Sequence, residues 1–164
     1  MTKNLEAVMI QLKIFEGINS IDQEAILDKY FTRRTYNANE SIVKKGELGE
    51  DMFILLDGMV KVKVSGRFFI DLNPGNIFGE VCLIDGGTRS ASVIAGTTAN
   101  LALLNRKAFE LFLKERPKDA SIFLYNLVRI LISRLRKTVE TVGESEMGLK
   151  QMQRLLMKLC LEST

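Results

Sequence analysis

The sequence predicts a mainly β domain: an antiparallel β-roll, similar to a jelly-roll barrel, with helices before it and a long helix after it. Two changes of hydrophobic period support this prediction. Apolar residues recur every three to four positions over residues 5–31 and again over 107–142, whereas residues 32–106 form short alternating segments separated by turn residues. With 164 residues and 46% apolar side chains, residues 1–164 are expected to be a single domain with its own core.

The first expected elements are N-terminal helices within residues 5–31. Leu5, Val8 and Leu12 follow the helical spacing. Ser20 is expected to cap a second helix, with Gln23 at the position of the capping-box partner. These helices are expected to cover the β-roll.

The expected strands lie between recognisable turns. Asp57-Gly58 is a hairpin signal, and the residues that follow it alternate cleanly between apolar and polar. Asn73-Pro74-Gly75 marks a turn shortly before the segment 78–91. The expected strands are residues 41–44, 53–56, 60–64, 68–70, 90–95 and 101–104.

Helices return over residues 107–142. A short helix is expected to end before Pro117, and a longer one is expected to run from 119 to 142. The longer helix has apolar positions at alternating gaps of four and three, as in a coiled coil. These positions are Leu124, Val128, Leu131, Leu135, Thr138 and Val142, and a second row assigned to the barrel side is Leu127, Ile132 and Val139. Two apolar rows on one helix predict a partner, most simply a second copy of the chain, giving a homodimer through residues 124–142.

The C-terminal stretch contains two glycines, Gly143 and Gly148, at which the sequence predicts a break in the helix. A terminal amphipathic helix is expected over residues 146–162. No further domain is expected after it.

The segment 78–91 combines the residue types that bind a sugar phosphate. Gly79 permits backbone conformations and close approaches that a Cβ atom prevents. Arg89 has a planar set of donors that suits a phosphate, and Glu80 can accept hydrogen bonds from hydroxyl groups. Residues 81–84 are long enough for about one helical turn, whose first N–H groups can face an anion.

The composition argues against an enzyme. The chain has no histidine, which removes the commonest general base and the usual metal ligand of small β-barrel enzymes. Carboxylates such as Asp71, Glu80 and Asp85 are not placed as a pair about one reacting bond. We therefore expect no catalytic residue, no metal ligand and no cofactor.

The same composition limits the expected location and partners. A net charge of +3 is too small to indicate nucleic acid or an anionic membrane as a partner. No apolar run approaches the roughly 20 residues of a membrane span, and the first residues are too polar for a signal peptide. Cys82 and Cys160 lack metal-ligand spacing, so both are expected to be reduced, with Cys82 buried. A cytoplasmic location is expected.

Two motifs carry a resemblance to a known family. FGE at residues 78–80, followed by RSASV at residues 89–93, closely resembles the phosphate-binding cassette of cyclic nucleotide-binding domains. Such domains occur in the catabolite activator protein, in the regulatory subunits of cyclic-AMP-dependent kinase and in nucleotide-gated channels. Residues 42–62 resemble the strands before the cassette, and residues 103–117 resemble the helix after it. The resemblance covers roughly residues 12–142.

This resemblance implies a cyclic nucleotide receptor that relays ligand binding through its C-terminal helices to a dimer or to an effector protein whose identity the sequence does not give. Thr138 matches a threonine that contacts the adenine amino edge in the activator, so cyclic AMP is favoured as the ligand over cyclic GMP. The activator has serine at the next position, contributed by the partner subunit, where this chain has Val139. The implied binding residues are Phe78, Gly79, Glu80, Val81, Cys82, Arg89, Ser90, Ala91 and Thr138.

Three alternatives remain open at this point. The chain could be the sensor half of an activator-type transcription regulator without its helix-turn-helix, or a domain that prefers cyclic GMP. It could also be a scaffold that keeps the fold without nucleotide, although both charged cassette residues, Glu80 and Arg89, are present.

Overall fold

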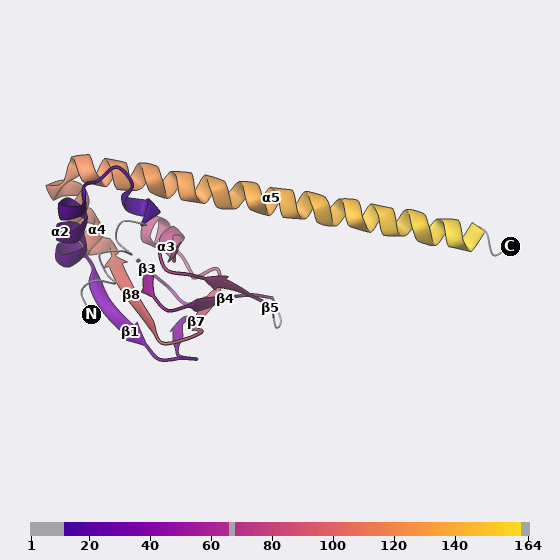
Figure 1. The fold of residues 1–164 in the computed structure, drawn as a ribbon, viewed down its shortest axis with the longest axis horizontal. Coiled ribbons are helices and arrows are strands. Elements are labelled where there is room, and N and C mark those ends of the chain that lie inside the picture. Colours follow the sequence, from indigo (N-terminus) through magenta and orange to yellow (C-terminus); the bar gives the residue numbers. More distant parts are fainter. Residues whose placement is uncertain (1–11, 66–67, 162–164) are drawn as a thin grey trace. The chain divides into compact units, whose positions relative to one another are not determined.

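The computed structural model describes residues 12–65 and 68–161 (Figure 1). The chain forms two compact units, Met1–Phe123 and Leu124–Thr164. The expected helix before Leu12 lies outside the described residues. No helix in the described ranges is long and apolar enough to cross a membrane.

Two antiparallel four-stranded sheets form the body of the first unit, which confirms the predicted β-roll. One sheet has the order β1 (Thr32–Tyr36), β8 (Ala99–Asn105), β3 (Asp51–Asp57) and β6 (Ile77–Phe78). The other has the order β2 (Ser41–Val43), β7 (Ser92–Ala95), β4 (Val60–Ser65) and β5 (Phe68–Leu72). The strands β1 and β6 were not expected. The residues of β1 are almost all exposed and charged or polar, and β6 is too short to show an alternating pattern.

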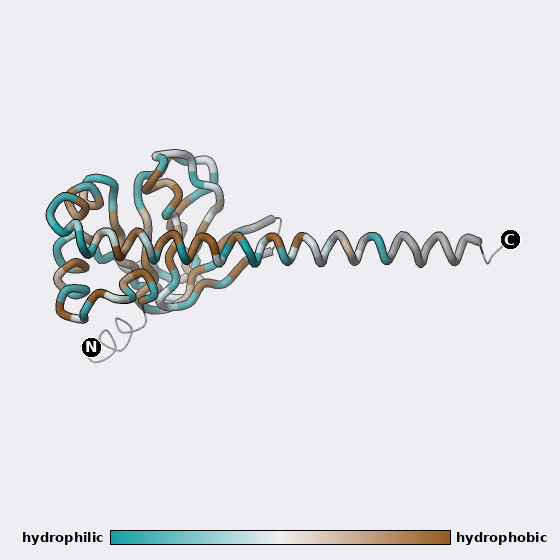
Figure 2. The backbone as a smooth tube through the Cα atoms, turned by 90° about the horizontal axis from the view of Figure 1, so that it is seen from above, coloured by the Kyte–Doolittle hydropathy of each residue, from teal (hydrophilic) through white to brown (hydrophobic). Residues whose placement is uncertain are grey.

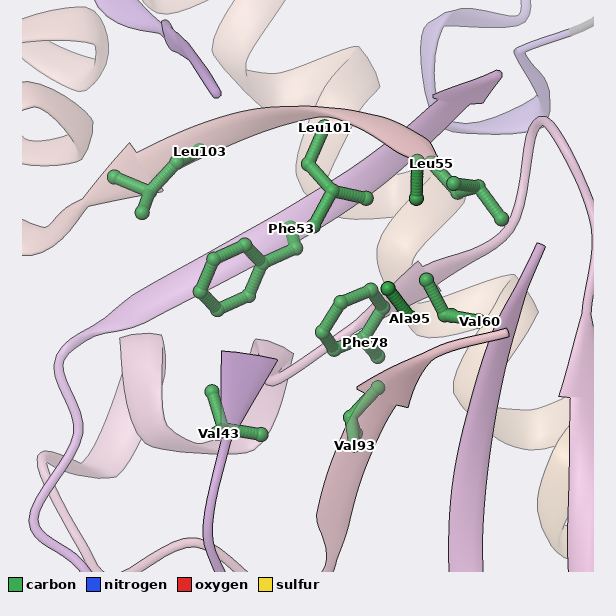
Figure 3. Packing of buried hydrophobic residues seen from close by; sticks show 10 residues of the cluster. Val43, Phe53, Leu55, Val60, Phe78, Val93, Ala95, Leu101 and Leu103 are labelled. Atoms are coloured by element: carbon green, nitrogen blue, oxygen red, sulfur yellow. The ribbon is translucent and has the colours of Figure 1, made fainter. Parts of the chain in front are cut away.

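The core fills the space between the two sheets with apolar side chains from both. Its buried members are Val43, Phe53, Leu55, Val60, Phe78, Val93, Ala95, Ala99, Leu101 and Leu103. The rings of Phe53 and Phe78 stack with their centroids 4.9 Å apart (Figure 3). Such a pair contributes about 0.5–1.5 kcal/mol beyond the burial of its area. Because Phe78 directly precedes Gly79, this packing fixes the start of the segment 78–91.

Helices of the first unit pack beside the sheets around a cluster of aromatic rings. They are the 3₁₀ turn η1 (Lys13–Phe15), α2 (Ser20–Tyr30), α4 (Arg106–Glu115) and the start of α5 (Pro117–Leu161). Phe123 lies 5.5 Å from Phe15 and 5.7 Å from Phe112, measured between ring centroids. The ring of Tyr30 lies tilted against that of Phe112, with the centroids 5.1 Å apart, and its hydroxyl donates a hydrogen bond of 2.7 Å to Glu115. The cluster therefore joins α2, α4 and α5.

Ion pairs reinforce the same junction. Arg116, between α4 and α5, pairs with Asp22 of α2 and with Asp119 of α5. Hydrogen bonding to Arg116 lowers the pKa of Asp22 below its ordinary value. Hydrogen bonding to Lys29 lowers the pKa of Glu115 in the same way. Each carboxylate thus has a cationic partner outside its own helix, Arg116 for Asp22 and Lys29 for Glu115.

The predicted cap of α2 is wrong by one residue. Asn19 is the N-cap, and its side chain accepts a hydrogen bond of 2.9 Å from the backbone N–H of Asp22. The side chain of Gln23 does not form a capping box. Its amide donates instead to the carbonyl oxygens of Phe15 and Ile18, which ties the preceding turn to the helix.

The C-terminal helix α5 is continuous over 45 residues, so the predicted break and the separate helix over 146–162 are wrong. An isolated glycine inside a helix costs only about 1 kcal/mol relative to alanine. Gly143 and Gly148 have open space around them and ordinary helical backbone conformations. Figure 2 shows hydrophobic and hydrophilic residues alternating in short runs along the described part of α5.

Exposure along α5 divides the apolar row that was assigned to the barrel side. Leu127 is buried, with 2% of its surface exposed, whereas Ile132 and Val139 are 45% and 63% exposed. Leu124 and Leu131, assigned to the seam, are only partly exposed. The exposed large apolar residues between 124 and 142 are Tyr125, Val128, Ile132, Leu135, Val139 and Val142. Their gaps are three, four, three, four and three, so the exposed row still has heptad spacing.

Candidate ligand-binding site

A short helix, α3 (Glu80–Asp85), forms the middle of the segment 78–91 and is bounded by two left-handed glycines. Gly79 precedes it with φ of 75° and Gly86 follows it with φ of 68°. A Cβ atom at Gly79 would lie 2.7 Å from Nη1 of Arg89 and 2.9 Å from the carbonyl oxygen of Asp51. Both the backbone conformation and the close approach therefore require glycine at this position.

Arg89 is the central side chain of the site and is only 6% exposed. Its Nη1 donates to the carbonyl oxygens of Asp51, at 2.6 Å, and Gly79, at 3.3 Å. Its Nη2 lies 3.7 Å from a carboxylate oxygen of Asp51, and its guanidinium lies 5.6 Å from the centroid of the Phe53 ring. A buried charge is unfavourable unless hydrogen bonds and an opposite charge compensate it. These contacts fix the cation beside the start of α3.

Gly49 makes room for this guanidinium. A Cβ atom there would lie 2.3 Å from Nε and 2.5 Å from Cζ of Arg89, which no real contact permits. The backbone is held in place nearby, since the N–H of Arg89 donates to the carbonyl of Glu47 at 2.8 Å. The N–H of Gly49 donates to the carbonyl of Gly87 at 3.2 Å. The loop before β3 and the loop after α3 therefore form one cradle around Arg89.

The side chains of α3 divide into a buried and an exposed face. Glu80, Cys82 and Leu83 are buried, and the expected burial of Cys82 is confirmed. Val81 and Ile84 are each 51% exposed. Glu80, which is only 7% exposed, directly follows Gly79, whose carbonyl oxygen accepts a hydrogen bond from Arg89.

The structure brings together most of the residues that the sequence predicted. Phe78 to Cys82 are contiguous with the Arg89 cradle, and Ser90 and Ala91 follow Arg89 directly before β7. Thr138 belongs to the second unit, where it is exposed and its hydroxyl donates to the carbonyl of Arg134 at 3.0 Å.

Sequence reasoning missed two residues of the cradle, Gly49 and Asp51. Gly49 is one of two glycines in the loop between β2 and β3, and no local pattern shows that it meets an arginine forty positions later. Asp51 contributes both its backbone carbonyl and its carboxylate. Only the carboxylate could have been noticed as a possible partner of an arginine.

Comparison with known proteins places this cradle in a family. The family model described as "Cyclic nucleotide-binding domain" matches residues 33–116, about half of the chain. The chain belongs to the cyclic nucleotide-binding domain family. The family is regulatory rather than catalytic, and the predicted resemblance and fold are confirmed.

Individual relatives agree with this assignment. A "Cyclic AMP receptor protein" of Thermus thermophilus is 32% identical over 129 residues, which are 76% of this chain and 57% of that protein. A "Cyclic nucleotide-gated potassium channel" of Mesorhizobium japonicum is 39% identical over 90 residues, 55% of this chain and 25% of the channel. The crystal structure of the Thermus thermophilus catabolite activator protein superposes with a TM-score of 0.69 at 28% identity, covering 80% of this chain and 62% of that one. The chain thus spans from a quarter to somewhat over half of these relatives.

Proposed function

We propose that the chain is a receptor for a 3′,5′-cyclic nucleotide and that it binds cyclic AMP more tightly than cyclic GMP. The observation that carries this proposal is the buried Arg89, held beside Gly79 by two backbone carbonyls and accommodated by Gly49. A guanidinium already fixed by the fold binds a phosphate with little further ordering, and its planar donors match phosphate oxygens.

Each residue of the site has a proposed role. Arg89 and the backbone amides near Gly79, Glu80 and Cys82 hold the cyclic phosphate. Glu80 accepts a hydrogen bond from the ribose 2′-hydroxyl. The neighbouring residues Phe78, Val81, Ser90 and Ala91 complete the pocket wall.

The proposed preference for cyclic AMP rests on Thr138. Because its hydroxyl already donates to the carbonyl of Arg134, the oxygen is left to act as an acceptor. Adenine presents an amino donor at the edge where guanine presents a carbonyl acceptor. A hydroxyl in this state therefore suits adenine, in agreement with the resemblance to the activator.

We further propose a parallel homodimer through residues 124–142. The exposed heptad row from Tyr125 to Val142 supports this pairing, since an apolar stripe of this spacing is typical of a two-stranded coiled coil. Arg129 and Arg136 both fall at the position after the second apolar residue of each heptad. An antiparallel pair would bring these like charges together, which favours the parallel arrangement. In this proposal, nucleotide binding and helix pairing strengthen each other, and the dimer passes the signal to an effector.

Arg89→Ala tests the nucleotide site. A charged partner lost from a desolvated contact typically costs about 2–5 kcal/mol, so cyclic AMP affinity should fall about 30- to 4,000-fold in isothermal titration calorimetry. Arg34→Ala, which removes the same charge from an exposed position of β1, is the matched control and should bind as wild type does. Unchanged affinity in folded Arg89→Ala would show that the phosphate is bound elsewhere.

A second candidate is the sensor segment of a longer regulator, because the Thermus thermophilus receptor extends well beyond the part matched here. Reading the coding sequence on both sides of residues 1–164 decides between a receptor formed by these residues alone and a sensor segment of a longer regulator. An open reading frame that continues into a further domain would favour the longer regulator.

A further inference from the structure

A second arginine, Arg106, reaches α3 at the end opposite to Arg89. It is the first residue of α4, and its Nη2 donates to the carbonyl oxygen of Cys82 at 3.3 Å. Its backbone N–H donates to the carbonyl oxygen of Glu50 at 3.0 Å. One residue thus joins α4, the start of β3 and the helix α3.

The helix α3 needs such external support. It has six residues, too few for a stable isolated helix, and it lies between two left-handed glycines, Gly79 and Gly86. Arg89 contacts the carbonyl of Gly79 before the helix, and Arg106 contacts the carbonyl of Cys82 within it and lies against Gly86 after it. The two arginines are attached to adjacent residues at the start of β3, since Arg89 donates to the carbonyl of Asp51 and the backbone N–H of Arg106 donates to the carbonyl of Glu50. The helix is therefore held at two points.

The placement of Arg106 is specific rather than a loose surface contact. A Cβ atom at Gly86 would lie 2.9 Å from its Nη2, so the guanidinium lies directly against the backbone that follows α3. Its Nε is buried and has no hydrogen-bond partner among the described residues. A buried donor left without an acceptor is unfavourable. A cation near the carbonyl end of a helix interacts favourably with the helix dipole, and this interaction offsets part of the free-energy cost of the buried donor.

We propose that Arg106 is a positioning residue for the nucleotide: it sets the tilt of α3 and thereby directs the Glu80 carboxylate at the ribose 2′-hydroxyl. This rests on the proposed function of the site. Because Arg106 begins α4, any displacement of α4 also moves its contact with Cys82. The position of α4 and the affinity for ribose nucleotides are therefore linked, and each affects the other by the same free energy.

The test compares cyclic AMP with 2′-deoxy-cyclic AMP, which lacks the hydroxyl that Glu80 is proposed to contact. A hydrogen bond to a charged group corresponds to about 10- to 150-fold in affinity, so wild type should bind the deoxy analogue weaker by about this factor. In Arg106→Met, which keeps the aliphatic stem but removes every donor, the ratio should fall to about threefold or less, because Glu80 is no longer aimed. Arg106→Lys keeps a cationic donor group, so its affinity ratio should lie between those of Arg106→Met and wild type.

The ratio separates positioning from stability. A variant that is only less folded loses affinity for both nucleotides by the same factor, which leaves the ratio unchanged. Lys107→Met removes the same charge from the next, exposed residue of α4 and should keep the wild-type ratio. If circular dichroism shows that Arg106→Met does not fold, Arg106→Lys is compared with wild type instead. Its ratio of the two affinities must then lie below the wild-type ratio.

The outcomes distinguish the positioning role of Arg106 from the nucleotide site itself. A wild-type ratio in folded Arg106→Met overturns the positioning role, and so does a wild-type ratio in Arg106→Lys where Arg106→Met does not fold. The nucleotide site stands in both cases, provided that wild type shows the ratio and Arg89→Ala loses binding. A wild-type protein that binds both nucleotides equally, or neither, removes the proposed role of Glu80 and the role of Arg106 with it.

Discussion

Gly49→Ala tests whether the cradle holds the Arg89 guanidinium in the position that binds the phosphate. The added methyl would lie 2.3–2.5 Å from Nε and Cζ of Arg89, so the guanidinium must leave its place. It would then lose its two hydrogen bonds to the carbonyls of Asp51 and Gly79. Hydrogen bonds of charged groups contribute about 1.5–3 kcal/mol each. The displaced guanidinium regains part of this free energy by hydrogen bonding to water, so we expect a stability loss of about 2–4 kcal/mol.

The measurement combines urea unfolding with calorimetric titration of cyclic AMP. Affinity in Gly49→Ala should fall at least about tenfold, since a displaced guanidinium must be ordered again before it can bind. Gly46→Ala is the control in the same loop: its φ is +87°, so it strains the backbone, but a Cβ atom there meets nothing within 4 Å. It should lose stability and keep affinity.

The double variant Gly49→Ala/Arg89→Ala tests whether the clash with Arg89 causes these losses. In the background of Arg89→Ala the clash is gone, so Gly49→Ala should cost almost nothing further in stability or affinity. Additive losses, or wild-type affinity in Gly49→Ala alone, would show that the position of the guanidinium is not what Gly49 secures.

Two further predictions concern the long helix. Thr138→Ala should weaken cyclic AMP binding about 3- to 10-fold and leave cyclic GMP binding unchanged in a competition titration, since a neutral hydrogen bond contributes about 0.5–1.5 kcal/mol; equal losses for both nucleotides would remove Thr138 from base recognition. Leu135→Asp should convert the proposed dimer to monomers in sedimentation equilibrium by placing charge in the exposed apolar row, whereas Ser133→Asp, off that row, should not. A wild-type chain that remains monomeric with ligand at high concentration would end the dimer proposal.

The parts of the fold that follow local patterns were predictable from the sequence. The alternation in Val60–Ser65 and the turn at Asp57-Gly58 correspond to β4 and the connection before it. The helix α4 ends at Glu115, close to Pro117 as expected. These elements depend on neighbouring residues, so their signals lie within a few positions of one another.

The errors arose where distant contacts or weak penalties decide the structure. The strand β1 is specified by its pairing with β8, not by its own charged sequence. The helix α5 continues through Gly143 and Gly148 because each glycine costs little in a long helix. The register of its exposed row could not be read from spacing alone, since Leu124 and Tyr125 both fit a heptad, and burial distinguishes them.

The candidate site shows the same division. Gly79, Glu80 and Arg89 were recognisable because their residue types suit a sugar phosphate and form a familiar motif. Gly49 and Arg106 lie outside the motif, and their importance appears only when the chain is folded, in contacts with Arg89 and with the carbonyl of Cys82.

The most direct test of the central claim is a calorimetric titration of the wild-type chain with cyclic AMP, run beside adenosine at the same concentrations. The account predicts saturable binding of one cyclic AMP per chain and adenosine affinity lower by at least about 100-fold, because Arg89 and the cassette amides act on the phosphate. Equal binding of adenosine, or no heat from cyclic AMP at millimolar concentration with folded protein, would contradict it.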